Sequence, residues 1–343
     1  MEVHHEWKGV LTSERYKNKA KSYYREEILE DEKKLLIAAR EDNTDVVRRL
    51  LSSNMVNANC SNDLHDNQTP LHNAAEKGHK KTAQLLIKNG ADVNVANIYG
   101  RTPLHTAAQN GHKEVAQLLI ESGADLDKAD NRGNTPRQFL WSFMGGANRE
   151  VAKLLIQNGT NLNVADKHGQ APLHCAAGRG HKEVVQLLIE RGARLNVSDR
   201  DGRIPLHWAA DKGHKEVAQL LIKSGANPNV TNIWGLSALH LAVDRGHAHV
   251  TKLLIELGAE PNVADSLGRT PLHWAARNGN EYVVQLLIQS RAELNVCDED
   301  GGTPLHEAAS WRRKEVAQLL IESGADMDKA DNYGNIPSQY LKD

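Results

Sequence analysis

The stretch GRTPLHTAAQNGHKEVAQLLIESGAD, Gly100–Asp125, predicts two short helices with a stop between them. Thr102 can cap the first helix because its hydroxyl accepts a backbone N–H bond, and Pro103 suits the first helical position, where no N–H is needed. Gly111 can adopt the left-handed conformation that ends this helix, and Gly123 can end the second in the same way. Isolated helices of fewer than ~12–15 residues are only marginally stable in water, so this unit needs neighbours.

The same pattern recurs along most of the chain. Its Thr-Pro-Leu-His element, or a variant of it, begins at Thr69, Thr102, Thr135, Ala171, Ile204, Ser237, Thr270, Thr303 and Ile336. The spacing is 33 residues throughout, except for 36 residues between Thr135 and Ala171. A fixed period of this length indicates stacked repeats, in which each repeat buries its apolar helix face against the next.

The repeats set the boundaries that we predict. In chain order the segments are an N-terminal arm that is partly helical or disordered, residues 1–30; an N-terminal capping repeat, 31–66; regular repeats, 67–132; an irregular repeat with a three-residue insertion, 133–168; regular repeats, 169–333; and a partial C-terminal repeat or cap, 334–343. The capping repeat lacks the Thr-Pro element, which suits a terminal unit with a more polar outer face.

The irregular repeat is explained by a duplication. DKADNRGNTPRQFL, Asp127–Leu140, closely resembles DKADNYGNIPSQYL, Asp328–Leu341, and KEVAQLLIESGAD occurs at both Lys113 and Lys314. We infer that residues 133–149 descend from a terminal cap that became internal. Two interpretations of this segment stay open, a tolerated loop insertion and a seam at which the stack bends or a partner docks.

The full pattern, GxTPLHxAAxxGHxxVxxLLIxxGADVN at a 33-residue period, resembles the ankyrin repeat from about Leu35 to Asp343. This resemblance implies an all-α solenoid of stacked helix–turn–helix units, each carrying a short β-hairpin finger. It also implies a module that binds other proteins through the concave face formed by the fingers and the inner helices, and that has no catalytic activity of its own.

Composition and charge argue against several classes of partner and location. The 42 Lys and Arg residues and 44 Asp and Glu residues give a net charge of −2, which argues against a nucleic-acid partner. The three cysteines, Cys60, Cys175 and Cys297, are far apart and favour a reducing compartment over a disulfide framework. The N-terminus resembles no signal peptide and no apolar run reaches ~18 residues, so we expect no membrane insertion and an intracellular location, cytoplasmic or nuclear.

Most of the 17 histidines occupy repeated positions, which the fold explains. Seven follow Pro-Leu or Ala-Leu, and five follow the glycine between the two helices: His72, His105, His174, His207, His240, His273 and His306, then His79, His112, His181, His214 and His247. We expect them to make structural hydrogen bonds near the helix ends. The other histidines show no metal-ligand spacing, so no metal, cofactor or catalytic residue is expected.

The positions that vary between repeats carry the information about a partner. Four of the six Trp residues and several Arg residues fall at such positions in repeats six to nine, counting the capping repeat as the first, and these residue types dominate interface hot spots. The candidate partner-binding residues are Arg203, Trp208, Trp234, Leu236, Arg245, Arg269, Trp274, Arg277, Trp311 and Arg312. For Trp208 and Trp274 the alternative stays open that the ring packs on a neighbouring inner helix.

These observations predict a non-catalytic, monomeric protein-binding module that acts as an adaptor or an inhibitor. One alternative is a structural spacer or self-assembling scaffold. Another is a targeting subunit of a longer parent protein. An enzyme would need a site in residues 1–30 or in Phe139–Ala147, and neither segment has titratable groups arranged for chemistry.

Overall fold

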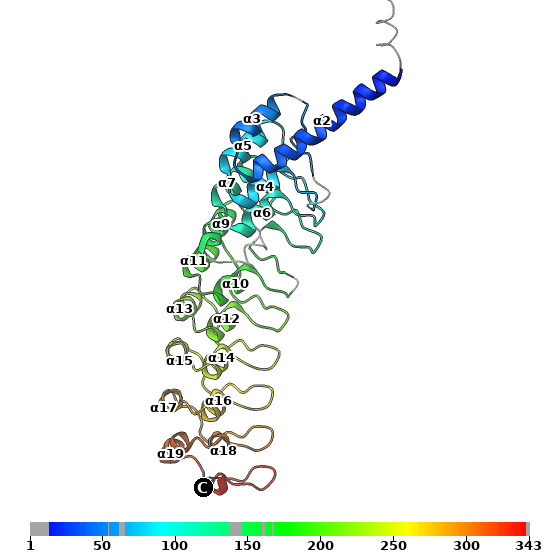
Figure 1. Cartoon of the computed structure of the whole chain (residues 1–343). Coiled ribbons are helices and arrows are strands. Elements are labelled where there is room, and N and C mark those ends of the chain that lie inside the picture. The colour runs from blue at the N-terminus through cyan, green and yellow to red at the C-terminus, as the bar shows by residue number, and fades with distance from the viewer. Residues whose placement is uncertain are drawn as a thin grey trace, which may run out of the picture. The chain divides into compact units, whose positions relative to one another are not determined.

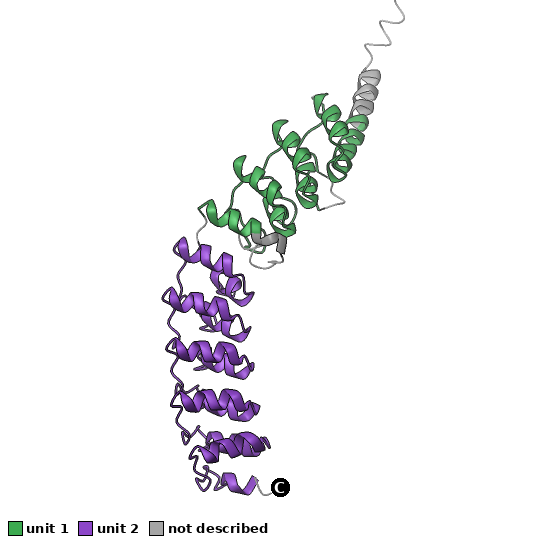
Figure 2. Cartoon of the chain, turned by 90° about the vertical axis from the view of Figure 1, so that its left-hand side faces the viewer, with its two compact units in different colours: residues 1–160 green, residues 161–343 purple. Residues whose placement is uncertain are grey.

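The structure is a computed structural model, which describes residues 14–53, 55–61, 66–136, 146–159, 162–166 and 168–340, without the side chains of residues 14–25 and 146–149. Residues 1–13 of the predicted arm, 137–145 of the predicted irregular repeat and 341–343 of the predicted C-terminal cap therefore lie outside the described residues. The chain divides into two compact units, residues 1–160 (unit 1) and 161–343 (unit 2), coloured separately in Figure 2.

Unit 1 consists of helices in alternating inner and outer positions. In chain order they are α2 (Glu14–Arg40), α3 (Thr44–Ser52), α4 (Pro70–Lys77), α5 (Lys80–Lys88), α6 (Pro103–Asn110), α7 (Lys113–Glu121) and α9 (Gly146–Gln157). The inner helices α2, α4 and α6 contact one another in sequence, as do the outer helices α3, α5, α7 and α9. Helix α2 runs without a break across the predicted boundary between the arm and the capping repeat, after residue 30. The position of that boundary therefore stays a prediction.

Unit 2 repeats the same arrangement (Figure 1). Its helices are α10 (Pro172–Gly178), α11 (Lys182–Glu190), α12 (Pro205–Asp211), α13 (Lys215–Lys223), α14 (Ala238–Asp244), α15 (Ala248–Glu256), α16 (Pro271–Asn278), α17 (Glu281–Gln289), α18 (Pro304–Ser310), α19 (Lys314–Glu322) and α20 (Pro337–Tyr340). The even-numbered helices form the inner row and the odd-numbered helices the outer row, each contacting the next helix of its row. The predicted all-α repeat fold is confirmed.

Each regular repeat buries the same positions. In one repeat, Leu206 and Ala209 of α12 and Leu221 of α13 are 0% exposed. They are the apolar positions that recur in every regular repeat, and burying apolar surface contributes ~25 cal/mol per Å². Because a single helix pair has too little core of its own, contacts between repeats supply most of the stability.

The Thr-Pro-Leu-His element forms a capping box. The His105 N–H group donates to Thr102 Oγ1 at 3.5 Å, and the Thr102 N–H group donates to His105 Nδ1 at 3.0 Å. The other ring nitrogen, His105 Nε2, lies 3.1 Å from the carbonyl oxygen of Asn134 in the next repeat. The repeated histidine therefore caps its own helix and also links neighbouring repeats, which explains its recurrence.

A loop that we call the finger connects each outer helix to the next inner helix. In the finger before α6, Asn97 Oδ1 accepts the N–H groups of Tyr99 and Arg101, both at 3.0 Å. The Asn97 N–H group also donates to the Arg101 carbonyl oxygen at 2.9 Å, which closes the turn. An Asp or Asn residue occupies this position in each described finger of this type, so we call it the finger Asx residue.

Single backbone hydrogen bonds join neighbouring fingers. In unit 1, Asn131 N–H donates to the Tyr99 carbonyl oxygen at 2.9 Å, and in unit 2, Ser266 N–H donates to the Trp234 carbonyl oxygen at 2.9 Å. The fingers are short turns, and one isolated antiparallel bridge, between Thr231 and Ser237, occurs in the described part of the chain. Residues 32 positions apart thus lie side by side on adjacent fingers.

Candidate partner-binding surface

Three positions of the regular repeat lie near the junction between the finger and its inner helix. They are the finger Asx residue, the residue four places later, and the residue nine places later on the inner helix, and we call them the finger set. In the sets of Asp199 and Asp265, Oδ1 accepts two backbone N–H groups. The second carboxylate oxygen accepts hydrogen bonds from side chains of the set. The sets that contain candidate residues are Asp199, Arg203 and Trp208; Asn232, Leu236 and Leu241; and Asp265, Arg269 and Trp274.

In the set of Asp265, Arg269 and Trp274, all three side chains contact one another. Arg269 Nε and Nη2 lie 3.1 and 3.0 Å from Asp265 Oδ2, and Trp274 Nε1 donates to the same oxygen at 3.2 Å. The guanidinium carbon of Arg269 lies 4.5 Å from the centre of the Trp274 ring. Burial alone raises the pKa of Asp265, but hydrogen bonds from backbone N–H groups and Arg269, together with the charge of Arg269, lower it overall.

The set of Asp199, Arg203 and Trp208 is arranged differently. Trp208 Nε1 donates to Asp199 Oδ2 at 3.1 Å. The guanidinium carbon of Arg203 lies 5.4 Å from the centre of the Trp208 ring and 5.5 Å from that of Trp234 on the next finger. Arg203 is thus held between two indole rings, and the structure brings together three of the predicted residues.

Among the other candidate residues, Leu236 belongs to the set of Asn232, whereas Arg245, Arg277, Trp311 and Arg312 belong to no finger set. The guanidinium carbon of Arg277 is 4.6 Å from the centre of the Trp311 ring, and Arg245 Nε donates to Asp211 Oδ1 at 2.8 Å. Leu236 is half-buried. Arg312 is exposed and has a φ of 55°, in the position that glycine occupies between the helices of the other regular repeats.

Exposure separates the four Trp residues into two pairs. Trp208 and Trp274 are half-buried, and each donates its indole N–H to the Asp residue of its own finger. Trp234 and Trp311 are 43% and 49% exposed. The geometry thus favours the packing alternative for the first pair and leaves the second pair accessible to a partner.

Sequence reasoning did not place the finger Asx residues in the candidate site. Asp199 forms part of the finger turn, because its Oδ1 atom accepts the backbone N–H groups of Asp201 and Arg203. Its second carboxylate oxygen nevertheless orients a candidate residue, Trp208. The available signal was the recurrence of Asp or Asn every 33 residues at this place in the regular repeats.

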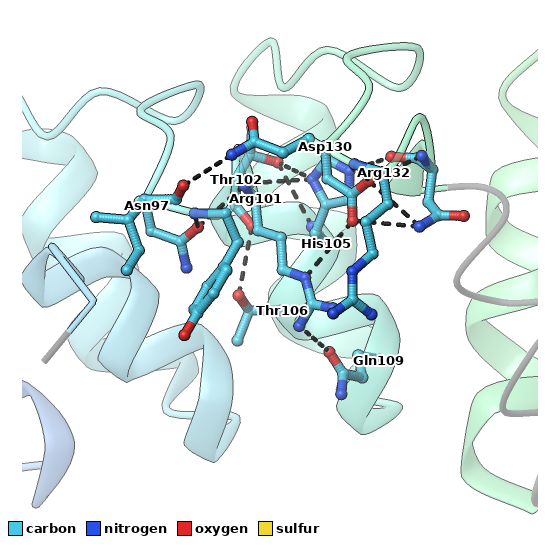
Figure 3. A network of polar contacts seen from close by, with 12 residues as sticks. Asn97, Arg101, Thr102, His105, Thr106, Gln109, Asp130 and Arg132 are labelled. Atoms are coloured by element: carbon cyan, nitrogen blue, oxygen red, sulfur yellow. Dashed lines mark hydrogen bonds and ion pairs between the residues drawn. The ribbon is translucent and has the colours of Figure 1, made fainter.

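Unit 1 holds a related polar network (Figure 3). Arg101 Nε lies 3.6 Å from Asp130 Oδ2 of the next finger, and Arg101 Nη1 donates to Gln109 Oε1 at 3.2 Å. A pocket of about 270 Å³ is lined by Tyr99, Arg101, Asp130, Asn131 and Arg132. Here an arginine of the finger set pairs with the carboxylate of the following finger.

The described residues lack a metal-binding cluster and a membrane-spanning helix. They contain no group of three or more His, Cys, Asp or Glu side chains that could hold a metal ion. None of their helices combines the length and the apolar character needed to cross a bilayer.

Comparison with known proteins identifies the repeat. The family described as ankyrin repeats (3 copies) matches residues 35–130, 141–232, 221–298 and 239–331. Human oxysterol-binding protein-related protein 1 is 45% identical over 67 residues, which are 19% of this chain and 7% of that protein. Human ankyrin repeat domain-containing protein 49 is 42% identical over 64 residues, 19% of this chain and 26% of that protein. Each match thus spans only a minor part of the relative, whereas the family pattern covers most of the chain: this protein belongs to the ankyrin repeat family.

Proposed function

We propose that this chain is a non-catalytic adaptor or inhibitor that binds a protein partner through the fingers and inner helices of repeats six to nine. Ankyrin repeats are generally protein–protein interaction modules without catalytic activity. The observation that carries the proposal is the row of Arg–Trp contacts and exposed apolar finger tips in unit 2.

The finger tips provide apolar contact area. Ile233, Trp234 and Leu267 are 61%, 43% and 47% exposed, and the backbone bond from Ser266 to Trp234 holds the two fingers side by side. Large apolar side chains that cluster at a surface typically mark an interface, because exposing them to water is otherwise unfavourable. Trp residues in particular supply much of the binding energy of protein interfaces.

The arginines are ordered before binding. Arg203, Arg269 and Arg277 each lie against an indole ring, and Arg269 is also fixed by a carboxylate. A cation–π contact contributes ~0.5–1 kcal/mol at an exposed site. Ordering a long side chain in the free protein removes part of the entropy cost that binding would otherwise carry.

The test uses a partner captured with the full chain and compares its affinity for two variants. Trp234→Ala removes an exposed indole from unit 2, and we expect it to weaken binding at least tenfold. Tyr99→Ala is the matched control, because Tyr99 occupies the same finger position in unit 1 and is 47% exposed. Equal affinities for wild type and Trp234→Ala would exclude this surface, as would a greater loss in Tyr99→Ala.

A further inference from the structure

Three arginines occupy the same position of the finger set, four residues after the finger Asx residue. Two of them are paired with carboxylates. Arg101 lies 3.6 Å from Asp130 Oδ2 of the next finger, and Arg269 lies 3.0 Å from Asp265 Oδ2 of its own finger. For the third, Arg203, a carboxylate could likewise come from its own finger or from the next finger.

Neither place supplies one to Arg203. In its own finger, the second carboxylate oxygen of Asp199 accepts the indole N–H of Trp208 at 3.1 Å. In the next finger, the residue that corresponds to Asp130 is Asn232, because the step from Arg203 to Asn232 equals that from Arg101 to Asp130. Within the described part of the chain, Arg203 makes no ion pair.

Arg203 and Asn232 each have one buried hydrogen-bond donor that is unused among the described residues. Arg203 Nε and Asn232 Nδ2 are both buried and have no hydrogen-bond partner among the described residues. Asn232 is only 6% exposed, and its Oδ1 is occupied by the N–H groups of Trp234 and Leu236, which fixes the amide nitrogen on the other side. A buried donor without an acceptor costs ~1–3 kcal/mol, so both groups favour an added oxygen acceptor.

The surroundings of Arg203 suit one kind of acceptor. The rings of Trp208 and Trp234 hold the guanidinium group but offer no hydrogen-bond acceptor. Arginine N–H groups in a fixed fork match the two oxygens of a carboxylate, and such pairs are the strong form of hydrogen bond. Trp234 and Ile233 beside them are exposed, so an approaching side chain would meet apolar surface around the charge.

We propose that Arg203, clamped between Trp208 and Trp234, receives the carboxylate of an Asp or Glu side chain from an acidic segment of the partner. This inference rests on the proposed function and names the chemistry of the partner at one point of the surface. The carboxylate takes the place with Arg203 that Asp130 takes with Arg101. Asn232 keeps that place free of an internal carboxylate.

The test uses the full chain with ¹⁵N-labelled Trp and the peptide acetyl-Glu₆-amide as the probe, with acetyl-Gln₆-amide as the uncharged control. We expect a saturable shift of the Trp234 indole N–H signal with the Glu peptide and none with the Gln peptide. Arg203→Gln should abolish the shift. Arg101→Gln is the matched control and should leave the affinity unchanged, because Arg101 occupies the same finger position in unit 1 and is already paired with Asp130.

Asn232→Asp gives a second, independent test that leaves Arg203, Trp208 and Trp234 in place. Its new carboxylate can pair with Arg203 inside the protein, so we expect at least tenfold weaker binding of the Glu peptide together with a higher thermal midpoint. Unchanged peptide affinity in Arg203→Gln or in Asn232→Asp overturns the inference, as does the lack of a saturable shift in the wild type. Should Trp234→Ala lose a protein partner that Asn232→Asp still binds as wild type does, the proposed function stands and only this inference falls.

Discussion

His105 Nε2 lies 3.1 Å from the carbonyl oxygen of Asn134, so one imidazole joins two consecutive repeats. The same contact recurs in unit 2, where His240 Nε2 lies 3.1 Å from the Arg269 carbonyl oxygen. These rings are buried, and burial disfavours their charged form. The row of repeated histidines therefore ties the stability of the repeat stack to pH.

The first prediction concerns acid. Burial is the largest cause that lowers the pKa of His72, His105, His207 and His240 from 6.5 to about 4. The unfolded chain then takes up protons before the folded one, so the stabilisation is complete above pH 6.5 and is lost as pH falls towards 4. Each of these rings therefore lowers the free energy of unfolding by roughly 2 kcal/mol at pH 5 relative to pH 7.5.

Urea unfolding followed by circular dichroism at pH 7.5 and pH 5.0 measures this effect. Carboxylates titrate mostly below this window, so the histidines dominate the change. His105→Gln should lower the stability at pH 7.5 and reduce the difference between the two pH values, whereas His249→Gln, at an exposed position, should change neither. A midpoint that is the same at both pH values would contradict the prediction.

The second prediction concerns two glycines with similar backbone conformation. Gly78 has a φ of 76° and Gly90 a φ of 86°. A Cβ atom at Gly78 would lie 2.5 Å from His112 Nδ1, whereas a Cβ atom at Gly90 would have nothing within 4 Å. The His112 ring cannot easily move away, because its Nε2 is hydrogen-bonded to the Glu76 carbonyl oxygen at 2.8 Å.

Both Gly→Ala variants carry the cost of a left-handed residue with a side chain, roughly 1–2 kcal/mol. Gly78→Ala should lose at least ~1 kcal/mol more in the free energy of unfolding, since it also displaces the ring. Gly90→Ala is thus the control that isolates the steric clash. Finding the two variants equally stable in urea would show that the His112 contact is not tight.

The local structure could be predicted from the sequence because it depends on neighbouring residues. The stretch that begins at Gly100 predicts a helix capped by Thr102 and ended by Gly111, and α6 has both features, with a φ of 75° at Gly111. Proline, glycine and hydroxyl side chains act within a few residues of the chain. The repeat period then extends the prediction to the other repeats that keep these residues.

The contacts of the candidate site could not be predicted in the same way. Whether an arginine of the finger set meets a carboxylate depends on the next finger, as the pairs Arg101–Asp130 and Arg203–Trp234 show. Side-chain packing also decides which residue of a finger set donates a hydrogen bond to the second Asx oxygen. In the set of Asp199, the donor is Trp208 alone. Asn232 therefore leaves Arg203 without the carboxylate that Asp130 supplies to Arg101. The sequence alone shows only that the same finger position is Asp or Asn in every regular repeat.

The last prediction separates Trp residues that stabilise the fold from those that are free to bind. Trp274 donates its indole N–H to Asp265 at 3.2 Å and is half-buried, whereas Trp234 is 43% exposed. Trp274→Phe removes the donor but keeps an aromatic ring, so the free energy of unfolding should fall by ~1 kcal/mol. Trp234→Phe should change it by less than ~0.5 kcal/mol, because surface substitutions seldom have a larger effect.

Urea unfolding of both variants at pH 7.5 makes this comparison, and the Trp208→Phe variant repeats it in a second finger set, where the same donor meets Asp199 at 3.1 Å. Losses in Trp274→Phe and Trp208→Phe with none in Trp234→Phe would assign the half-buried pair to the fold. If instead Trp274→Phe were as stable as wild type, its hydrogen bond to Asp265 would contribute nothing measurable. Trp274 would then have the same claim to a binding role as Trp234.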